Sequence, residues 1–415
     1  MTMTLPSPLT FVRGSLLGLA LISAGESGPL RAETPVQWER VQLDARFRSE
    51  GVAVGDLNKD GKQDIVAGDY WYEAPGWTKH EIRPPGDYWA GQGYSNSFCN
   101  WTYDMNGDGW LDIVIVGFPG EPFHWYENPK GAAQEGQGGH WKQHLIWHSI
   151  CNESPQFTDL TGDGRPEFVL GSQPEQQMGY LEIPKGDAVY QKWSFTPISL
   201  PGDPNKNGTF KYYHGIGVTD LNGDGRNDVV IPHGWWEQPA TLEAKPWAFH
   251  ELKLAAKEGG EPEKGADIHS DDLDLDGDRD LIMSSAHQFG LWWFESGEKQ
   301  SKPGVTAHVL KEPCSQTHAL LFVDVNGDGK KDLITGKRYY AHNGGDPGAN
   351  EPVVMFWYEI ERKADGPKFI PHEIVAGRDT GVGTQFMTAD INGDGLLDIA
   401  LSNKKGVNIL LQRKP

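Results

Sequence analysis

An acidic nonapeptide of the form Asp-x-(Asn/Asp/Thr)-x-Asp-Gly-x-x-(Asp/Glu) occurs seven times in this chain of 415 residues. Recurrence of a motif at long, similar intervals is typical of closed or stacked repeat architectures. We therefore expect seven similar structural units rather than one irregular core. Successive copies begin 48 to 66 residues apart, at Asp56, Asp104, Asp159, Asp220, Asp272, Asp324 and Asp390.

The side chains at positions 1, 3, 5 and 9 of the nonapeptide carry oxygen, and the glycine at position 6 permits a sharp turn. Calcium accepts about six to eight oxygen ligands, and the spacing resembles the first half of an EF-hand loop without its terminal glutamate. The competing interpretation is a set of Asx turns in which each carboxylate accepts hydrogen bonds from its own backbone. Seven copies favour calcium in up to seven loops; the third copy, with Thr161 and Glu167, is the weakest candidate. The predicted ligands are Asp56, Asn58, Asp60, Asp64, Asp104, Asn106, Asp108, Asp112, Asp159, Thr161, Asp163, Glu167, Asp220, Asn222, Asp224, Asp228, Asp272, Asp274, Asp276, Asp280, Asp324, Asn326, Asp328, Asp332, Asp390, Asn392, Asp394 and Asp398.

The nonapeptides also explain most of the acidity of the chain. They contain 23 Asp and Glu residues against 7 Lys and Arg residues, whereas the whole chain has a net charge of −21. The acidity is therefore better explained by metal ligation than by a basic partner. A chain this acidic is also a poor partner for nucleic acid.

The N-terminal segment indicates export. Residues 1–32 resemble a secretory signal peptide, in which Arg13 precedes an apolar run from Leu16 to Ala24 and cleavage would follow Ala32. The apolar run is too short to cross a bilayer as a helix, and no run of 18 apolar residues follows it. We expect a periplasmic, extracellular or cell-surface protein without a transmembrane span. Cys99 and Cys151 could form a disulfide, and buried free thiols are the equal alternative.

Each repeat contains four short segments that are rich in β-branched and aromatic residues and are bounded by Gly, Pro or Asp. In the first repeat these are residues 51–55, 65–68, 70–73 and 77–82. Such segments are typical of antiparallel strands. Four strands in each of seven units predict an all-β, seven-bladed β-propeller over residues 36–415. The recurring tryptophans of the third segment are expected to pack between blades.

The two ends of the repeat region complement each other. The seventh repeat ends with residues 407–411 and is one strand short, whereas the segment from Val36 to Leu43 contains Trp38 and matches the missing fourth strand. We predict that this N-terminal strand completes the last blade and closes the ring.

The order of strands in a blade predicts where polar side chains meet. The acidic loops connect first to second strands, so they share one face of the propeller. Side chains at the starts of first strands and in second-to-third connections should converge at the opposite face, around the central channel. This set comprises Glu50, Glu153, His214, His233, His269, His287, His318, Lys337, Arg338 and His342.

Several imidazoles that face a polar channel are poor core material, which favours a functional site. The second-to-third connection of the sixth unit, residues 335–352, is long, and such loops on a rigid scaffold often carry function. Lys337 and Arg338 within it either serve this site or compensate nearby carboxylates. Fourth-strand histidines are instead expected to satisfy hydrogen bonds at the sheet edge. These are His80, His144, His250, His308 and His372.

Two resemblances follow from these motifs. The acidic loops and the strands after them resemble the FG-GAP or VCBS repeat class, whose members are calcium-binding propellers that include the integrin alpha-chain head. The segments His214-Gly215-Ile216-Gly217, Gly234-Trp235-Trp236-Glu237, Ala286 to Glu295 and 336–343 are similar to the propeller part of the aldos-2-ulose dehydratase group of sugar lyases. The first resemblance implies a fold and favours an adhesion or ligand-binding propeller. The second implies a carbohydrate-active lyase or dehydratase.

A β-elimination on a keto or oxidised sugar needs a base, an electrophile that holds the enolate, and an acid for the leaving hydroxyl. Histidine suits the first and third roles; alternatively, His214, His269 and His318 could ligate one further divalent metal that polarises the carbonyl. Lys337 and Arg338 could anchor the enolate or a carboxylate. His287 completes the candidate set, and His342 and Glu351, both on the long loop, are second in rank. Convergence of the histidines within a few ångströms would favour the lyase, and scatter around the rim would favour a non-catalytic propeller that binds a carbohydrate or other small molecule.

Overall fold

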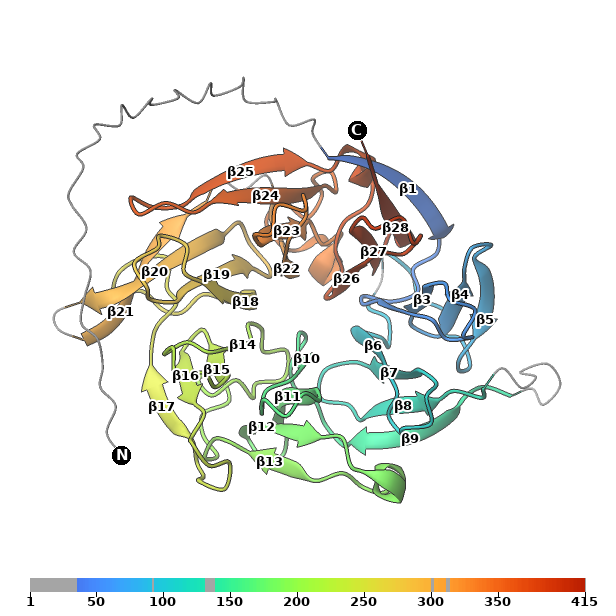
Figure 1. Ribbon diagram of the computed structural model, residues 1–415, viewed down its shortest axis with the longest axis horizontal. Coiled ribbons are helices and arrows are strands. Elements are labelled where there is room, and N and C mark those ends of the chain that lie inside the picture. The colour runs from blue at the N-terminus through green and yellow to red at the C-terminus, as the bar shows by residue number, and fades with distance from the viewer. Residues whose placement is uncertain (1–35, 92, 131–138, 300–301, 311–313, 415) are drawn as a thin grey trace, which may run out of the picture. The chain divides into compact units, whose positions relative to one another are not determined.

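The computed structural model describes residues 36–414 except 92, 131–138, 300–301 and 311–313. The predicted signal peptide, residues 1–32, lies outside this part. The described strands form seven separate four-stranded sheets, each paired antiparallel throughout. The view down the shortest axis shows the sheets as blades arranged around a common centre (Figure 1). The predicted seven-bladed propeller is therefore confirmed.

The first six blades each use four consecutive strands, numbered here from the channel outward. Blades 1 to 3 consist of β2 (Ala53–Gly55), β3 (Asp64–Ala67), β4 (Tyr70–Glu73) and β5 (Thr78–Glu81); β6 (Cys99–Tyr103), β7 (Asp112–Val116), β8 (Phe123–Glu127) and β9 (Lys142–Trp147); and β10 (Gln156–Thr158), β11 (Glu167–Ser172), β12 (Gln177–Glu182) and β13 (Phe195–Pro197). Blades 4 to 6 consist of β14 (Gly217–Thr219), β15 (Asp228–Ile231), β16 (Gly234–Glu237) and β17 (Ala248–Glu251); β18 (Gly265–Asp271), β19 (Asp280–Ser285), β20 (Leu291–Lys299) and β21 (Lys302–Val309); and β22 (Leu320–Val323), β23 (Asp332–Gly336), β24 (Met355–Glu361) and β25 (Lys368–Glu373).

Helical structure in the described residues is limited to short 3-10 turns between strands. They are η1 (Gly186–Tyr190), η2 (Ala341–Gly344) and η3 (Val375–Gly377). None of the described helices has the length and apolar character needed to cross a membrane.

Blade 7 joins the two ends of the described chain. From the channel outward it consists of β26 (Phe386–Ala389), β27 (Asp398–Asn403), β28 (Gly406–Arg413) and β1 (Gln37–Asp44). Strand β1 pairs with β28 so that Trp38 lies opposite Gln412, and Arg40 Nε donates a hydrogen bond to Asn408 Oδ1 at 2.9 Å. Figure 1 shows β1 beside β28 at the outer edge of the ring. The prediction that the N-terminal strand completes the last blade is confirmed.

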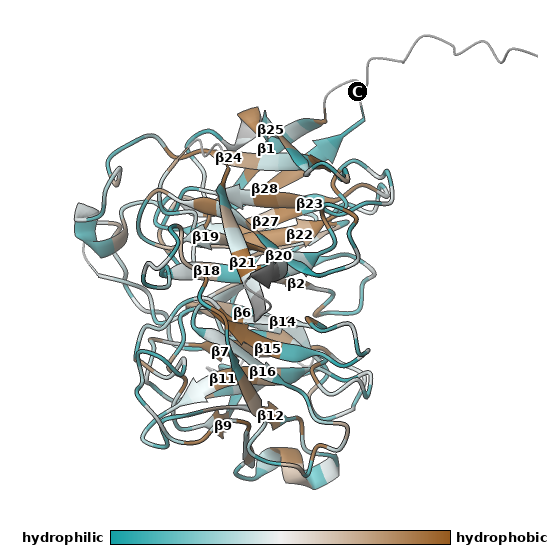
Figure 2. Ribbon diagram, turned by 90° about the vertical axis from the view of Figure 1, so that its left-hand side faces the viewer, coloured by the Kyte–Doolittle hydropathy of each residue, from teal (hydrophilic) through white to brown (hydrophobic). Residues whose placement is uncertain are grey.

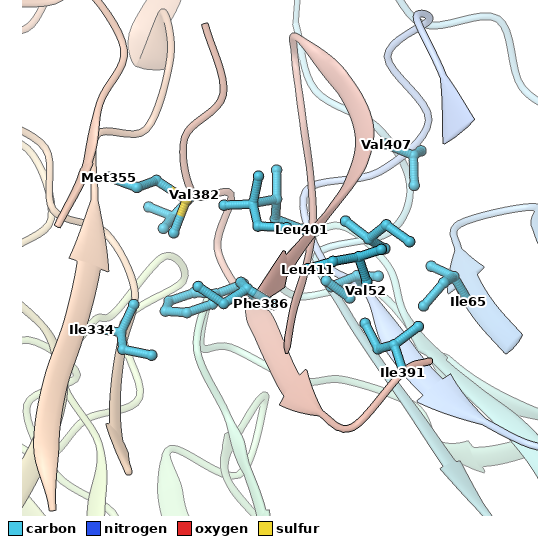
Figure 3. Close-up of a cluster of buried hydrophobic side chains, with 14 of the residues drawn as sticks. Val52, Ile65, Ile334, Met355, Val382, Phe386, Ile391, Leu401, Val407 and Leu411 are labelled. Carbon is cyan, nitrogen blue, oxygen red and sulfur yellow. The ribbon is translucent and has the colours of Figure 1, made fainter. Parts of the chain in front are cut away.

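Apolar side chains fill the space between neighbouring blades. The largest cluster joins blade 7 to blades 6 and 1 (Figure 3). Burying a side chain such as Phe386, which is 1% exposed, contributes about 1.5–3 kcal/mol relative to leaving it in water. The strands carry most of the hydrophobic residues, and the loops at both ends are largely hydrophilic (Figure 2). The labelled members of the cluster are Val52, Ile65, Ile334, Met355, Val382, Phe386, Ile391, Leu401, Val407 and Leu411.

A belt of stacked rings runs along the outer strands of five blades. In blade 1, His80 stacks on Trp71 with ring centroids 4.3 Å apart, and its Nε2 lies 2.7 Å from Glu73 Oε2. The same Trp–His–Glu contact recurs in blades 2, 4, 5 and 6. The ring centroids there are 4.2–4.3 Å apart, and the distances from His Nε2 to the Glu oxygen are 2.7–3.2 Å. The expected structural role of the fourth-strand histidines is therefore confirmed. The other four are His144, His250, His308 and His372.

The closing strand gives a stability prediction. Replacing Trp38, which packs against the cluster at blade 7, by alanine should lower the free energy of unfolding by about 2–3 kcal/mol through lost burial. On the same strand, Glu39 forms an ion pair with Arg413 at the surface, with a nitrogen–oxygen distance of 2.7 Å. Glu39→Ala should therefore change the free energy of unfolding by less than about 1 kcal/mol. Urea unfolding followed by tryptophan fluorescence measures both. Equal effects of the two substitutions would contradict the proposed packing role of Trp38.

Candidate functional site

Four of the predicted histidines meet at the end of the propeller opposite the acidic loops. His214 precedes β14, His287 lies between β19 and β20, His318 precedes β22, and His342 lies in η2 between β23 and β24. Ring centroids are 4.8 Å apart for His318 and His214, 4.6 Å for His214 and His287, and 4.5 Å for His287 and His342. Blades 4, 5 and 6 therefore contribute to one contiguous cluster.

Two imidazole nitrogens and one carboxylate oxygen lie unusually close together within this cluster. His214 Nε2 is 3.0 Å from His318 Nε2. Glu153 Oε2, from the segment before β10, is 3.4 Å from the first nitrogen and 3.3 Å from the second. All three residues are buried, and His318 Nδ1 has no hydrogen-bond partner among the described residues. Lone-pair atoms this close in a buried place are unfavourable unless a proton or a cation lies between them.

A buried guanidinium holds Glu153 in position. Arg338 is 1% exposed; its Nη1 lies 3.2 Å from Glu153 Oε2 and its Nε lies 3.3 Å from Glu50 Oε2. Its guanidinium carbon is 5.2 Å from the ring centroid of Tyr94. Glu50 precedes β2, so Arg338 connects residues of blades 1, 3 and 6. This agrees with the alternative in which the cation compensates nearby carboxylates.

The protonation states of the cluster follow from these contacts. Although burial opposes ionisation, His214, His318 and Arg338 hold the pKa of Glu153 well below its usual range. Burial, reinforced by Arg338, holds the pKa of His318 well below its usual value, and burial beside His214 lowers the pKa of His287 to about 3. At neutral pH the site therefore presents the carboxylate of Glu153 beside the neutral imidazoles of His287 and His318, the forms that ligate metals. One ligand atom from each of His214, His287 and His318 lies within 4.8 Å of the others.

Asp346 links the outer part of the cluster. Its Oδ1 lies 2.9 Å from His342 Nδ1, and its Oδ2 accepts a hydrogen bond from Gln316 Nε2 at 3.0 Å. The same Oδ2 is 3.4 Å from His287 Nδ1. His287, His342 and Asp346 thus form a second group of nearby ligand atoms.

A cavity of about 670 Å³ opens beside the histidines. This volume falls in the range of about 300–1,000 Å³ that is typical of small-molecule sites. Phe210 and Tyr212 on its wall are 45% and 36% exposed, so aromatic faces are available to a ligand. The lining residues near the cluster are Glu153, His214, His287 and His342, and the wall beyond includes Tyr94, Phe98, Phe118, Phe210, Tyr212, Tyr213, His233 and Lys264.

Other predicted site residues lie elsewhere. Lys337 is fully buried, and its Nζ donates to Ser315 Oγ at 2.9 Å and to Gln316 Oε1 at 3.2 Å. Neither Lys337 nor Arg338 is among the described residues that line the cavity. Glu351 is exposed.

His269 does not stand at the start of its strand as expected. Strand β18 runs from Gly265 to Asp271, and His269 lies three residues before the acidic motif, whereas His214 and His318 each lie six residues before theirs. His269 Nε2 consequently lies 3.1 Å from Leu320 O of blade 6, and the residue does not line the cavity in the described part of the chain. The structure therefore replaces His269 by His287 as the third member of the cluster.

Sequence reasoning overlooked Asp346 and the aromatic wall. Asp346 lies in the β23–β24 connection, and the unusual length of this connection was the sequence feature that could have indicated a role for its residues in the site. Phe118, Phe210 and Tyr212 come from connections that follow no repeated pattern. Cys99 and Cys151 are buried and form no disulfide with each other.

The acidic loops lie at the other end of the propeller and show extensive side-chain to backbone bonding. In blade 1, Asp56 accepts hydrogen bonds from Asp60 N and Gly61 N, and Asp64 accepts from Leu57 N and Ala74 N. Burial raises the pKa of Asp64 to about 6. These are the bonds of Asx turns, and they leave calcium binding a prediction.

Two of the acidic loops bring three carboxylates together. The ligand atoms of Asp159, Asp163 and Glu167 in blade 3 lie within 4.8 Å of one another, and the same holds for Asp272, Asp274 and Asp276 in blade 5. The sequence predicted the blade 3 loop to be the weakest calcium site, yet in the described part of the chain it is one of the two acidic loops whose carboxylates lie this close together.

Comparisons with known proteins identify the repeat. A family model described as FG-GAP-like repeat matches residues 104–170 and 272–335. The chain therefore contains FG-GAP-like repeats, and the matched segments include the acidic loops of blades 2, 3, 5 and 6. A search of curated proteins finds no match.

Solved structures share the propeller at low similarity. They include an Agrocybe aegerita lectin that recognises non-reducing terminal N-acetylglucosamine (16% identity, 91% of this chain and 86% of that chain, TM-score 0.47). The exotype rhamnogalacturonan lyase YesX is 11% identical over 91% of this chain and 72% of that one, with a TM-score of 0.41. The rhamnogalacturonan lyase YesW is 13% identical over 90% and 75%, with a TM-score of 0.39. Likenesses of this size carry no inference about activity.

The ion pairs of Arg338 give a second stability prediction. Arg338→Met should lower the free energy of unfolding by about 3–5 kcal/mol, because it leaves Glu50 and Glu153 buried without their cation. Arg413→Met, which removes an exposed pair with Glu39, is the matched control and should cost less than about 1 kcal/mol. Denaturant unfolding at neutral pH compares them. An Arg338 variant as stable as the control would show that the buried network does not support the fold.

Proposed function

We propose that the protein is a carbohydrate-active carbon–oxygen lyase that catalyses β-elimination on a keto or oxidised sugar. The observation that carries this proposal is the convergence of His214, His287 and His318 with Glu153 beside a cavity of about 670 Å³. A propeller that served only as a scaffold would gain nothing from buried imidazoles with unpartnered nitrogens, which cost stability. Convergence rather than scatter is the arrangement that favours the lyase over the non-catalytic alternative.

We further propose that this cluster binds a divalent transition metal. Tetrahedral zinc with bonds of about 2.0 Å holds its ligand atoms about 3.3 Å apart. The three distances among His214 Nε2, His318 Nε2 and Glu153 Oε2 are 3.0, 3.3 and 3.4 Å, which match such a triangle. His287 offers a further nitrogen on the side of the cavity. A bound ion of this kind supplies a Lewis acid for the substrate carbonyl.

The remaining residues would bind and orient the sugar. Phe118, Phe210 and Tyr212 present ring faces on which the apolar face of a sugar can pack. Arg338 acts as a positioning residue, since it contacts Glu153 rather than the cavity. The mouth of the cavity carries Glu261, Glu263 and Lys264, which would contact polar groups of the ligand.

The lyase proposal predicts activity on a defined panel. Purified protein incubated with keto sugars and uronic-acid polymers should generate conjugated enones, which are followed by ultraviolet absorbance. His214→Ala and His318→Ala should each lower the rate at least about 100-fold. His250→Ala, in the exposed Trp–His–Glu belt, should keep the wild-type rate. Wild-type silence on the whole panel favours the non-catalytic binding propeller, and activity in both cluster variants refutes the site.

The metal proposal has a readout independent of turnover. Protein equilibrated with zinc and then dialysed should retain one zinc ion per chain at the cluster, measured by elemental mass spectrometry. His318→Ala should lose this ion because it removes the fully buried ligand of the triangle. His308→Ala, on the outer strand of blade 5, is the control. Equal zinc content in the His318 and His308 variants would exclude the cluster as the site.

We also propose that the acidic loops bind calcium and stabilise the propeller. Ligands that bind only the native state stabilise it by mass action, by about 2.7 kcal/mol per site at one hundred times the dissociation constant. Excess chelator should therefore lower the Tm substantially, and added calcium should restore it. Differential scanning calorimetry measures both. An unchanged Tm in chelator would leave the Asx-turn interpretation of the loops.

A further inference from the structure

The loop that carries His342 adopts a strained backbone. Tyr340, His342 and Asn343 have φ angles of 55°, 48° and 53°, all in the left-handed region. Residues with a Cβ atom pay for this conformation, by roughly 1–2 kcal/mol each. Such strain persists only where surrounding contacts hold it, and it is concentrated at functional sites.

Contacts from two other connections, β5–β6 and β27–β28, hold the strained segment. His342 N donates a hydrogen bond to Tyr94 Oη at 2.9 Å, and Gly93 N donates to Asn343 Oδ1 at 3.2 Å. Both partners lie in the connection between β5 and β6. Lys404 Nζ, from the turn between β27 and β28, donates to Tyr340 O at 3.0 Å. The position of His342 beside the cavity is therefore set by blades 1, 2, 6 and 7 together.

The imidazole of His342 has one nitrogen engaged and the other available. Its Nδ1 lies 2.9 Å from Asp346 Oδ1, and because a carboxylate only accepts, Nδ1 carries the proton. Nε2 then holds a lone pair and makes no hydrogen bond to another described residue. The side chain of His342 is 49% exposed and lines the cavity, whereas that of Asp346 is 13% exposed. Gln316, which donates to the other oxygen of Asp346, fixes the carboxylate.

We propose that His342 is the acid–base residue of the site and that Asp346 is its positioning residue; this rests on the lyase function proposed above. His342 Nε2 takes the proton from the carbon next to the substrate carbonyl. The electron pair of that C–H bond forms the carbon–carbon double bond as the neighbouring carbon–oxygen bond breaks. The departing hydroxyl takes the proton back from Nε2 and leaves as water, so the imidazole returns to its starting form.

The other histidines are less suited to this role. Nε2 of His214 and Nε2 of His318 lie 3.0 Å from each other and close to Glu153, in a buried part of the cluster. His342 is more exposed than His287, which also lines the cavity: their side chains are 49% and 15% exposed. The competing arrangement is a metal held by His287, His342 and Asp346, whose ligand atoms also lie within 4.8 Å.

The first experiment needs no substrate. Nitrogen-15 NMR of the histidine-labelled full chain, with the His342 signals assigned by their loss in His342→Gln, reports which ring nitrogen carries the proton. We expect Nδ1–H in the wild type. In Asp346→Asn the amide can donate to Nδ1, so the Nε2–H form should dominate. An Nε2–H form in the wild type, or no change in Asp346→Asn, overturns the proposal, as does loss of one bound zinc ion in His342→Gln.

The second experiment uses whichever panel sugar the wild type converts. Asp346→Asn should lower kcat about 10²- to 10⁴-fold, the usual contribution of a positioned acid–base group, while KM changes less than about threefold and zinc content is unchanged. His250→Gln, whose Nε2 contacts Glu237 on the outer strands, is the control and should keep kcat. If the wild type is active and Asp346→Asn keeps the same kcat, the acid–base role proposed for His342 is refuted and the lyase function is not. A wild type inactive on every sugar refutes the lyase function and this role together.

Discussion

The candidate site depends on one buried guanidinium. Arg338 lies between Glu50 and Glu153, which come from blades 1 and 3, while its own backbone belongs to the connection after β23 in blade 6. Burying three charges is costly, and the cost is offset only when the partners are well placed. The packing of the blades supplies that placement. In return, Arg338 holds Glu153 beside His214 and His318, and this creates the close group of lone-pair atoms on which the chemistry of the site rests.

The architecture could be predicted because its determinants are local and repeated. Seven copies of a nonapeptide, each followed by short apolar segments, specify seven similar blades. The missing fourth strand of the last repeat could be matched to the segment with Trp38 for the same reason, since every other repeat supplied the pattern. Convergence of His214, His287, His318 and His342 also followed from strand order alone, because connections of one kind share one end of a propeller.

The parts that escaped prediction depend on features that do not repeat. His269 misses the cluster because it lies three residues before its acidic motif, within β18, whereas His214 and His318 lie six residues before theirs, an offset that the sequence itself shows. Asp346 contacts His342 in a loop where three of the four positions from Tyr340 to Asn343 are left-handed, a conformation that the side chains there do not predict. The aromatic wall combines Phe118 with Tyr212, which are brought together by the curvature of the ring. The geometry of the site, and the part of its composition that Asp346 and the aromatic wall supply, therefore did not follow from the repeat pattern.

The pairing of β1 with β28 has a consequence for how the molecule is made. Arg40 and Asn408, which hydrogen bond across this pair, are 368 residues apart. The entropy of closing so long a loop grows only with the logarithm of its length, so the separation matters more for timing than for final stability. Domains generally fold as units during synthesis, with N-terminal ones first. Here β1, the first propeller strand to be synthesised, has no partner until β28, the last one, has been translated. Until then β1 is an unpaired strand, so the ring can close only after β28 has been synthesised.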